Sequence, residues 1–189
     1  MRTKKCSACK EIKSLTDFPR NRKGPDGLNY HCKICHNQIN NKWRNTTRGY
    51  LVTRYHTICA REKIRRGNPN SIKCHFTFEK LLVAFEKHIS IYGMRSAWGP
   101  GVNNLEQHLP ITIIAKGNGE LGRHGSIKGS KTIGSNLSID RLDSNLDYTL
   151  QNIIFIRNDE NERKKHTTYE DCKIQIRLHE ERFIKMNAI

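Results

Sequence analysis

Two Cys-x2-Cys pairs constrain the first part of this chain more than any other feature of its sequence. The pairs are Cys6/Cys9 and Cys32/Cys35, and residues 10–31 separate them. Each pair places two thiolates on one tight turn, and two such turns complete a tetrahedron of sulfur ligands around Zn²⁺. The alternatives are free buried thiols or a redox-active pair, which would need a βαβ context that this sequence lacks. We therefore expect a structural zinc site with no coordination position open for catalysis.

The segment between the pairs contains Asp26-Gly27, which predicts a tight hairpin turn between two short strands. His31 and His36 flank the second pair. Because four thiolates already fill the site, we expect both imidazoles at the surface or facing a partner. The other cysteines have no Cys-x2-Cys partner and are expected to pack as small apolar side chains; they are Cys59, Cys74 and Cys172.

Positive charge is concentrated in the first part of the chain. Residues 1–70 hold 17 of the 34 Lys and Arg residues but 4 of the 18 acidic ones, so they carry +13 of the net +16. A strongly basic segment beside a segment of nearly balanced charge indicates that the basic one binds a polyanion. The zinc-type cysteines beside this charge favour nucleic acid as that polyanion. We expect Trp43 to pack against the zinc-binding segment rather than stack on a base. The expected DNA-contacting arm consists of Lys42, Trp43, Arg44, Arg48, Arg54, Arg61, Arg65 and Arg66.

Other classes of protein find little support in the sequence. No run approaches the roughly 18 apolar residues of a membrane-spanning helix, and the first residues do not resemble a signal peptide. Four of seven cysteines in Cys-x2-Cys pairs fit a reducing compartment, so we expect a cytoplasmic protein without a membrane partner. Motifs of P-loop ATPases, serine hydrolases and zinc proteases are absent.

Residues 76–189 read as a second folded unit of helices and short strands. Phe78 to Tyr92 has apolar residues at helical spacing, with Thr77 as N-cap and Gly93 after the end. Further expected elements are a strand at 109–115, a glycine-rich loop at 116–136, a strand at 153–156, a helix at 158–165 and a last helix opening at Thr168.

The segment from Ser138 to His166 reads as strand, turn, strand and helix. This order can bring Asp140 of the first strand against Asn161 of the helix, on one hard cation. Carboxylate and amide oxygens suit Mg²⁺ or Mn²⁺, with water and a substrate phosphate completing the octahedron. The alternative is a turn-rich unit in which the Asp and Asn side chains serve only the turns.

The same segment resembles the HNH, or ββα-metal, endonucleases, and in particular a group common in phages and mobile elements with a Ser-x-Asp-Arg-x-Asp signature. A glycine of that signature is Asp147 here. The N-terminal cysteine segment separately resembles the zinc ribbons that often precede such nucleases. The matching residues are Ser138, Asp140, Arg141, Asp143, Tyr148, Asn152, Ile153, Asn161 and Lys164.

The resemblance implies an α+β protein with a zinc ribbon at 1–45, a basic helical DNA-contacting linker at 46–75 and an HNH-like nuclease domain at 76–189. It implies metal-dependent hydrolysis of phosphodiester bonds in double-stranded DNA, with structural Zn²⁺ and catalytic Mg²⁺ or Mn²⁺. Asp140 and Asn161 would be the metal ligands, and Asn152 would tie the loop between the two strands. If a phage or homing element encodes the chain, its location would be the host cytoplasm.

The histidine that serves as general base in the wider family is Arg141 here. An arginine stays protonated and cannot accept the proton, but its planar fork can clamp a phosphate. The first candidate for the base is His124, and His166 and Asp143 are alternatives. A non-catalytic zinc-ribbon DNA-binding protein with a degenerate HNH domain is the main alternative function, and an RNA-binding zinc ribbon is a third.

Overall fold

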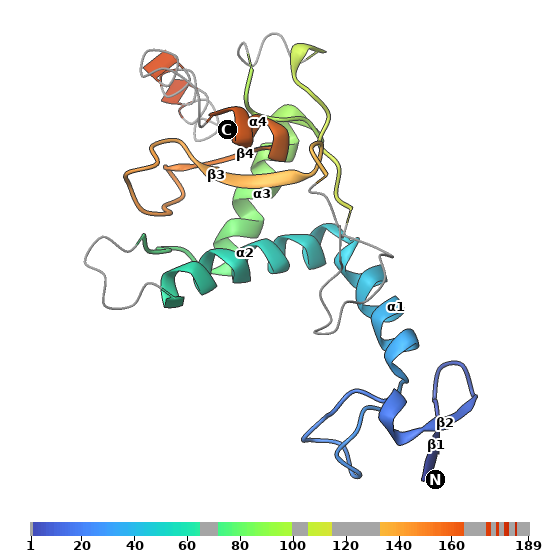
Figure 1. Ribbon diagram of the computed structural model, residues 1–189. Helices are drawn as coiled ribbons and strands as arrows, with labels where there is room; N and C mark the ends of the chain where they lie inside the picture. The colour runs from blue at the N-terminus through green and yellow to red at the C-terminus, as the bar shows by residue number, and fades with distance from the viewer. Residues whose placement is uncertain are drawn as a thin grey trace.

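The computed structural model describes residues 2–64, 72–99, 106–114 and 133–164, and the single positions 173, 174, 177, 180, 181 and 184. Most of the expected glycine-rich loop and the expected helix start at Thr168 lie outside these residues. The described part is mixed α and β, with two separate two-stranded antiparallel sheets (Figure 1). Its elements are β1 (Thr3–Lys5), β2 (Ile12–Ser14), the 3-10 helix η1 (Leu15–Asp17), α1 (Lys33–Arg44), α2 (Thr47–Ile64), α3 (Phe78–Tyr92), β3 (Leu137–Arg141), β4 (Ile153–Arg157) and α4 (Asn158–Lys164).

The N-terminal segment has a small core of its own. Cys6, Phe18 and Cys32 are buried together, beside the β1–β2 pair. The turn predicted at Asp26-Gly27 is present, with Gly27 at φ +73° and the Leu28 N–H donating to Asp26 Oδ1 at 3.1 Å. The prediction of two short strands flanking this turn is wrong, because a single antiparallel bridge between Arg20 and Leu28 is formed there instead of a strand pair.

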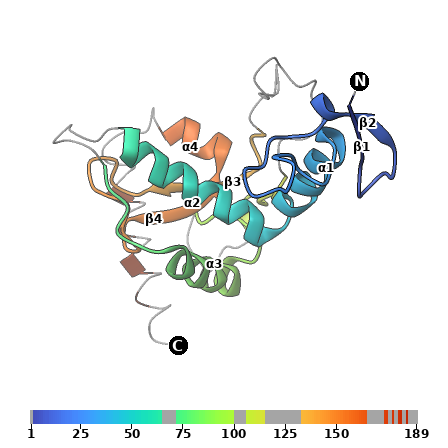
Figure 2. The same cartoon turned by 90° about the horizontal axis from the view of Figure 1, so that it is seen from below.

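Helix α2 forms one wall of the main core. Its Tyr50, Leu51 and Ile58 are buried in the same cluster as side chains of α3, β3 and β4. Figures 1 and 2 both show α2 running alongside the β3–β4 pair, with α1 leading from the cysteine segment into it. The Tyr50 hydroxyl donates to the Leu137 carbonyl of β3 at 2.9 Å. The basic segment is therefore joined to the β3–β4 unit through one buried face.

Helix α3 has the predicted bounds, Phe78–Tyr92. Thr77 caps it by accepting from the Lys80 N–H, and Gly93, at φ +60°, ends it by donating to the Ile89 carbonyl. The Phe85 ring meets the Phe155 ring of β4 edge-on, with ring centres 5.1 Å apart. Such an edge-to-face pair stabilises the contact between helix and sheet beyond simple burial.

Strands β3 and β4 pair antiparallel with Asp140 opposite Ile154, and α4 begins directly after β4. The strand–turn–strand–helix order predicted for this segment is confirmed. The strand predicted at 109–115 is wrong. Pro110 has no N–H to donate, and the next two N–H groups go to different segments, that of Ile111 to Met94 and that of Thr112 to Ser135. Isolated bridges result instead of a ladder.

No helix among the described residues has the length and apolar character needed to cross a membrane.

The junction of α1 and α2 requires a glycine. A Cβ on Gly49 would lie 2.1 Å from the Trp43 carbonyl oxygen, which is backbone and cannot swing away. Thr46 ties the junction by donating to that same carbonyl at 2.7 Å and accepting from the Gly49 N–H at 3.1 Å. The two helices therefore meet at a fixed close approach.

We predict that Gly49→Ala lowers the free energy of unfolding by about 1–3 kcal/mol because of this collision. Helix propensity alone would raise stability by about 1 kcal/mol, so the sign of the change is diagnostic. The measurement is urea unfolding followed by circular dichroism. His56→Ala, at an exposed position of the same helix, is the control and should cause little change. A Gly49→Ala protein more stable than the parent would contradict the described junction.

Candidate functional sites

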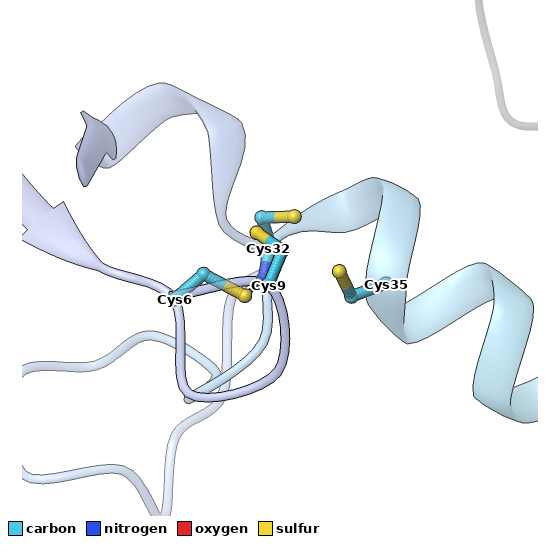
Figure 3. A group of neighbouring side chains, drawn as sticks. All are labelled: Cys6, Cys9, Cys32 and Cys35. Carbon is cyan, nitrogen blue, oxygen red and sulfur yellow. Dashed lines mark hydrogen bonds between the residues drawn. The ribbon is translucent and has the colours of Figure 1, made fainter. Parts of the chain in front are cut away.

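Four cysteines form the first site. The sulfur atoms of Cys6, Cys9, Cys32 and Cys35 all lie within 4.8 Å of one another. Cys32 and Cys35 sit at the start of α1, and Cys6 and Cys9 on the turn after β1, with the four side chains gathered in one place (Figure 3). Bonds of about 2.3 Å to one zinc would require sulfur atoms roughly 3.8 Å apart. The cluster therefore suits one tetrahedral metal ion.

The protein environment favours ionisation of one thiol in this cluster over the others. The Cys32 N–H, 3.3 Å from Cys6 Sγ, is the main cause that lowers the pKa of Cys6 to about 6. Burial, followed by the neighbouring thiols, raises the pKa of Cys35 to about 12. Thiolates this close repel one another, and a divalent cation removes that conflict. The donor set thus fits a zinc ion better than four free thiols.

We predict that the purified protein contains one zinc ion per chain, measured by elemental analysis. Cys32→Ser should lose the metal and destabilise the N-terminal segment, because this cysteine also belongs to its buried core. Cys59→Ser is the control, since Cys59 lies outside the cluster, and should keep the metal. Full zinc content in Cys32→Ser would contradict the assignment.

A polar pocket of about 290 Å³ forms the second site, bounded by α2, β3 and α4. Asp140 and Arg141 reach it from β3, Asn161 and Glu162 from α4, and Arg54 from α2. The pocket therefore contains both of the expected metal ligands and one arginine of the expected DNA-contacting arm.

The expected metal ligands have distinct partners in this pocket. Asp140 Oδ2 is 2.7 Å from Lys164 Nζ, and the side chains are 15 % and 8 % exposed. Lys164 also donates to the Arg141 carbonyl. Asn161 donates from its side-chain Nδ2 to Ser138 Oγ at 2.9 Å. The other side-chain atom, the carbonyl oxygen Oδ1, has no hydrogen bond among the described residues. The oxygen atom that a hard cation would select is thus left available.

Arg141 is engaged in the loop between β3 and β4. Its Nη1 donates to the carbonyls of Ser144 and Leu146, the latter at 2.7 Å, and its guanidinium lies over the Tyr148 ring at 5.1 Å. Its Nε is buried and has no hydrogen-bond partner in the described ranges. These contacts favour a role in which Arg141 stabilises the loop between β3 and β4. Binding of a phosphate by Arg141 stays a prediction.

Asn152 crosses the same loop. Its Nδ2 donates to the carbonyls of Asp143 and Asp147 at 3.0 and 2.9 Å, and its Oδ1 accepts from the Asp143 N–H at 2.9 Å. Asp143 in turn accepts from the Asn145 N–H at 2.8 Å, which is a turn-capping bond. Of the three candidates for a general base, His124 and His166 lie outside the described residues.

The expected DNA-contacting arm divides into different environments. Lys42 and Arg44 are exposed on α1, and Trp43, 47 % exposed, lies beside Gly49 of α2. Arg48 stacks on the Phe78 ring at 5.1 Å. Arg65, Arg66 and the side chain of Arg61 fall outside the described residues. Glu162 lines the pocket but is not among the site residues predicted from the sequence. Its position next to Asn161 in the sequence could have indicated it.

Asp147, at the position where the resembled HNH signature has a glycine, holds residues 73–75 through its carboxylate. Its Oδ1 accepts from the Lys73 N–H at 2.8 Å and its Oδ2 is 2.7 Å from His75 Nε2. The Lys73 N–H, followed by His75, holds the pKa of the Asp147 carboxyl below its ordinary value. The Asp147 carboxylate therefore ties residues 73–75 to the loop after β3.

We predict that Asp147→Asn lowers the melting temperature at pH 7. Because the folded-state pKa is depressed, the stabilisation is present above the unfolded pKa of about 3.9 and is lost as the pH falls through the lower folded pKa. The deficit should therefore shrink as the pH approaches 3. Asp17→Asn, at an exposed site, is the control. A deficit that does not change between pH 7 and pH 3 would contradict the role of the ionised carboxylate.

Comparison of the chain with protein-family models found no match, and comparison with curated proteins found none either. The HNH resemblance therefore rests on the motif residues and on the strand–strand–helix unit that carries them.

Proposed function

We propose that this chain is a metal-dependent endonuclease of the HNH type that hydrolyses phosphodiester bonds in double-stranded DNA. One observation carries the proposal: Asp140 and Asn161 line the same polar pocket, on a strand–strand–helix unit, with a basic helix as the third wall. Turn-serving residues would have no reason to converge on a pocket.

The residues divide the work as follows. Asp140 and the side-chain carbonyl oxygen of Asn161 would hold Mg²⁺ or Mn²⁺. When bound, the ion would supply charge stabilisation for the phosphate and the leaving 3′-oxygen. Lys164, paired with Asp140 at 2.7 Å, keeps the carboxylate oriented. Arg141 and Asn152 keep the loop between β3 and β4 in one shape, so that the strand bearing Asp140 is held in place.

The N-terminal part supplies affinity for DNA. The zinc ribbon fixes the start of α1 through Cys32 and Cys35, and the exposed Lys42 and Arg44 lie in the last turn of that helix. Contacts of this kind are made with phosphates, so binding should be independent of sequence and weaken steeply with salt. The arrangement suits a phage or homing-type enzyme that grips the duplex beside its cutting site.

A second candidate function is a non-catalytic DNA-binding protein with the same fold. The Lys164–Asp140 ion pair favours it, because the ammonium already neutralises the carboxylate that the metal needs. Metal-dependent cleavage separates the two functions.

The test is incubation with supercoiled plasmid in Mg²⁺, Mn²⁺ or EDTA. We expect nicking or linearisation that EDTA abolishes, and a loss of at least about a hundredfold in Asp140→Ala, because the metal loses the carboxylate ligand that β3 supplies. DNA binding by the variant should remain. Asp17→Ala, which removes an exposed carboxylate that does not line the pocket, is the matched control and should cut like the parent.

Three outcomes would contradict the proposal. Asp140→Ala cutting at the parent's rate would remove the metal-centre assignment. DNA binding without cleavage by the parent, with any metal, would favour the non-catalytic function, and cleavage of RNA alone would change the substrate class.

A further inference from the structure

We infer that Arg54 of α2 binds the phosphate group at the pocket, and that Tyr50 positions it. The inference rests on the proposed function and adds a substrate-binding residue from outside the strand–strand–helix motif. Arg54 lines the pocket together with Asp140 and Asn161, although it lies 86 positions before Asp140 in the chain.

The guanidinium of Arg54 is held by a buried anchor. The Tyr50 hydroxyl accepts from Arg54 Nε at 3.1 Å and from Nη2 at 2.6 Å, and the guanidinium lies over the Tyr50 ring at 5.0 Å. The hydroxyl proton is itself given to the Leu137 carbonyl of β3. Its lone pairs are therefore directed to Arg54, and the arginine is fixed relative to the strand that carries Asp140.

The charge of Arg54 is not neutralised within the described residues. The neighbouring cations Lys164 and Arg157 each have a carboxylate at 2.7 Å or less, whereas Arg54 has no ion pair in the ranges that the structure describes. A half-buried arginine without a carboxylate favours binding of an anion. In a pocket beside candidate ligands for Mg²⁺, the anion that fits is a backbone phosphate.

The hydrogen-bond capacity of Arg54 fits the same role. Its Nε and Nη2 bind Tyr50, with a longer contact of 3.5 Å from Nη2 to Asn158, while its Nη1 has no hydrogen bond among the described residues. Arg141, by contrast, has its Nη1 committed to two loop carbonyls. Arg54 therefore has a terminal donor group, Nη1, to offer an anion, whereas the unpaired Nε of Arg141 is buried.

The test measures kcat and KM for cleavage of a DNA duplex in Mg²⁺. Arg54→Ala should lower kcat by about a hundredfold, because one charge-assisted contact to the reacting phosphate is lost. Arg54→Lys should recover part of the loss, since a lysine keeps the charge without the fork. Lys87→Ala removes one positive charge from an exposed site on α3 and is the charge-matched control.

The positioning role of Tyr50 has its own readout. Tyr50→Phe keeps the buried ring but removes the hydroxyl, and should lower kcat about tenfold with little effect on KM. In an Arg54→Ala background the same change should have no further effect, because Tyr50 acts through Arg54. Melting temperatures establish that each variant is folded. Equal losses from Tyr50→Phe in both backgrounds would show a merely structural hydroxyl.

The outcomes separate this inference from the proposed function. If the parent cuts and Arg54→Ala has the same kcat and KM as Lys87→Ala, the inference is overturned and the nuclease stands. If the parent does not cut, fluorescence anisotropy with a labelled duplex decides. Weaker binding by Arg54→Ala than by Lys87→Ala then supports the phosphate site without catalysis, and equal binding overturns it. If Arg54→Ala does not fold, Arg54→Lys and Tyr50→Phe take its place in both assays.

Discussion

The hydrogen bond from Tyr50 to the Leu137 carbonyl lies at the contact on which the arrangement of this molecule depends. It joins α2, the helix of the basic segment, to β3, the strand that carries Asp140. A buried bond of this kind contributes about 1 kcal/mol, and the apolar burial of Leu51 and Ile58 beside it contributes more. Without this contact the pocket would lose one of its three walls. The basic segment and the candidate catalytic unit are thus parts of one packed body.

A physical chain runs from the cysteine cluster to the pocket. The second cysteine pair lies at the start of α1. The backbone of Trp43 at the end of α1 lies close to Gly49 of α2, which fixes how the two helices meet. Helix α2 in turn packs on β3. Each link is a direct contact between neighbouring elements, so the orientation of α1 relative to the pocket is set by packing. The fold thereby couples the surface proposed to bind DNA to the pocket where the phosphate would react.

Local signals in the sequence predicted the local parts of this structure. The cysteine spacing, the capped helix from Phe78 to Tyr92 and the strand–strand–helix order after Ser138 were all legible from neighbouring residues. What the sequence did not show depends on contacts between distant segments. The strand expected around Ile111 failed because its N–H groups bind two different partners, and the arm residue Arg54 entered the pocket only because Tyr50 docks on β3. The i, i+4 spacing of Tyr50 and Arg54 places them on one face, but no local pattern predicts what that face meets.

The central claim is that Asp140 and Asn161 hold a divalent cation in the pocket beside Arg54. The most direct measurement is anomalous diffraction from crystals of the protein soaked in Mn²⁺. The account predicts one peak at bonding distance, about 2.1 Å as for Mg²⁺, from an Asp140 carboxylate oxygen and from the side-chain carbonyl oxygen of Asn161, in addition to a zinc peak at the four cysteines. A crystal with Mn²⁺ bound elsewhere or not at all, and with Lys164 still covering Asp140, would contradict the account.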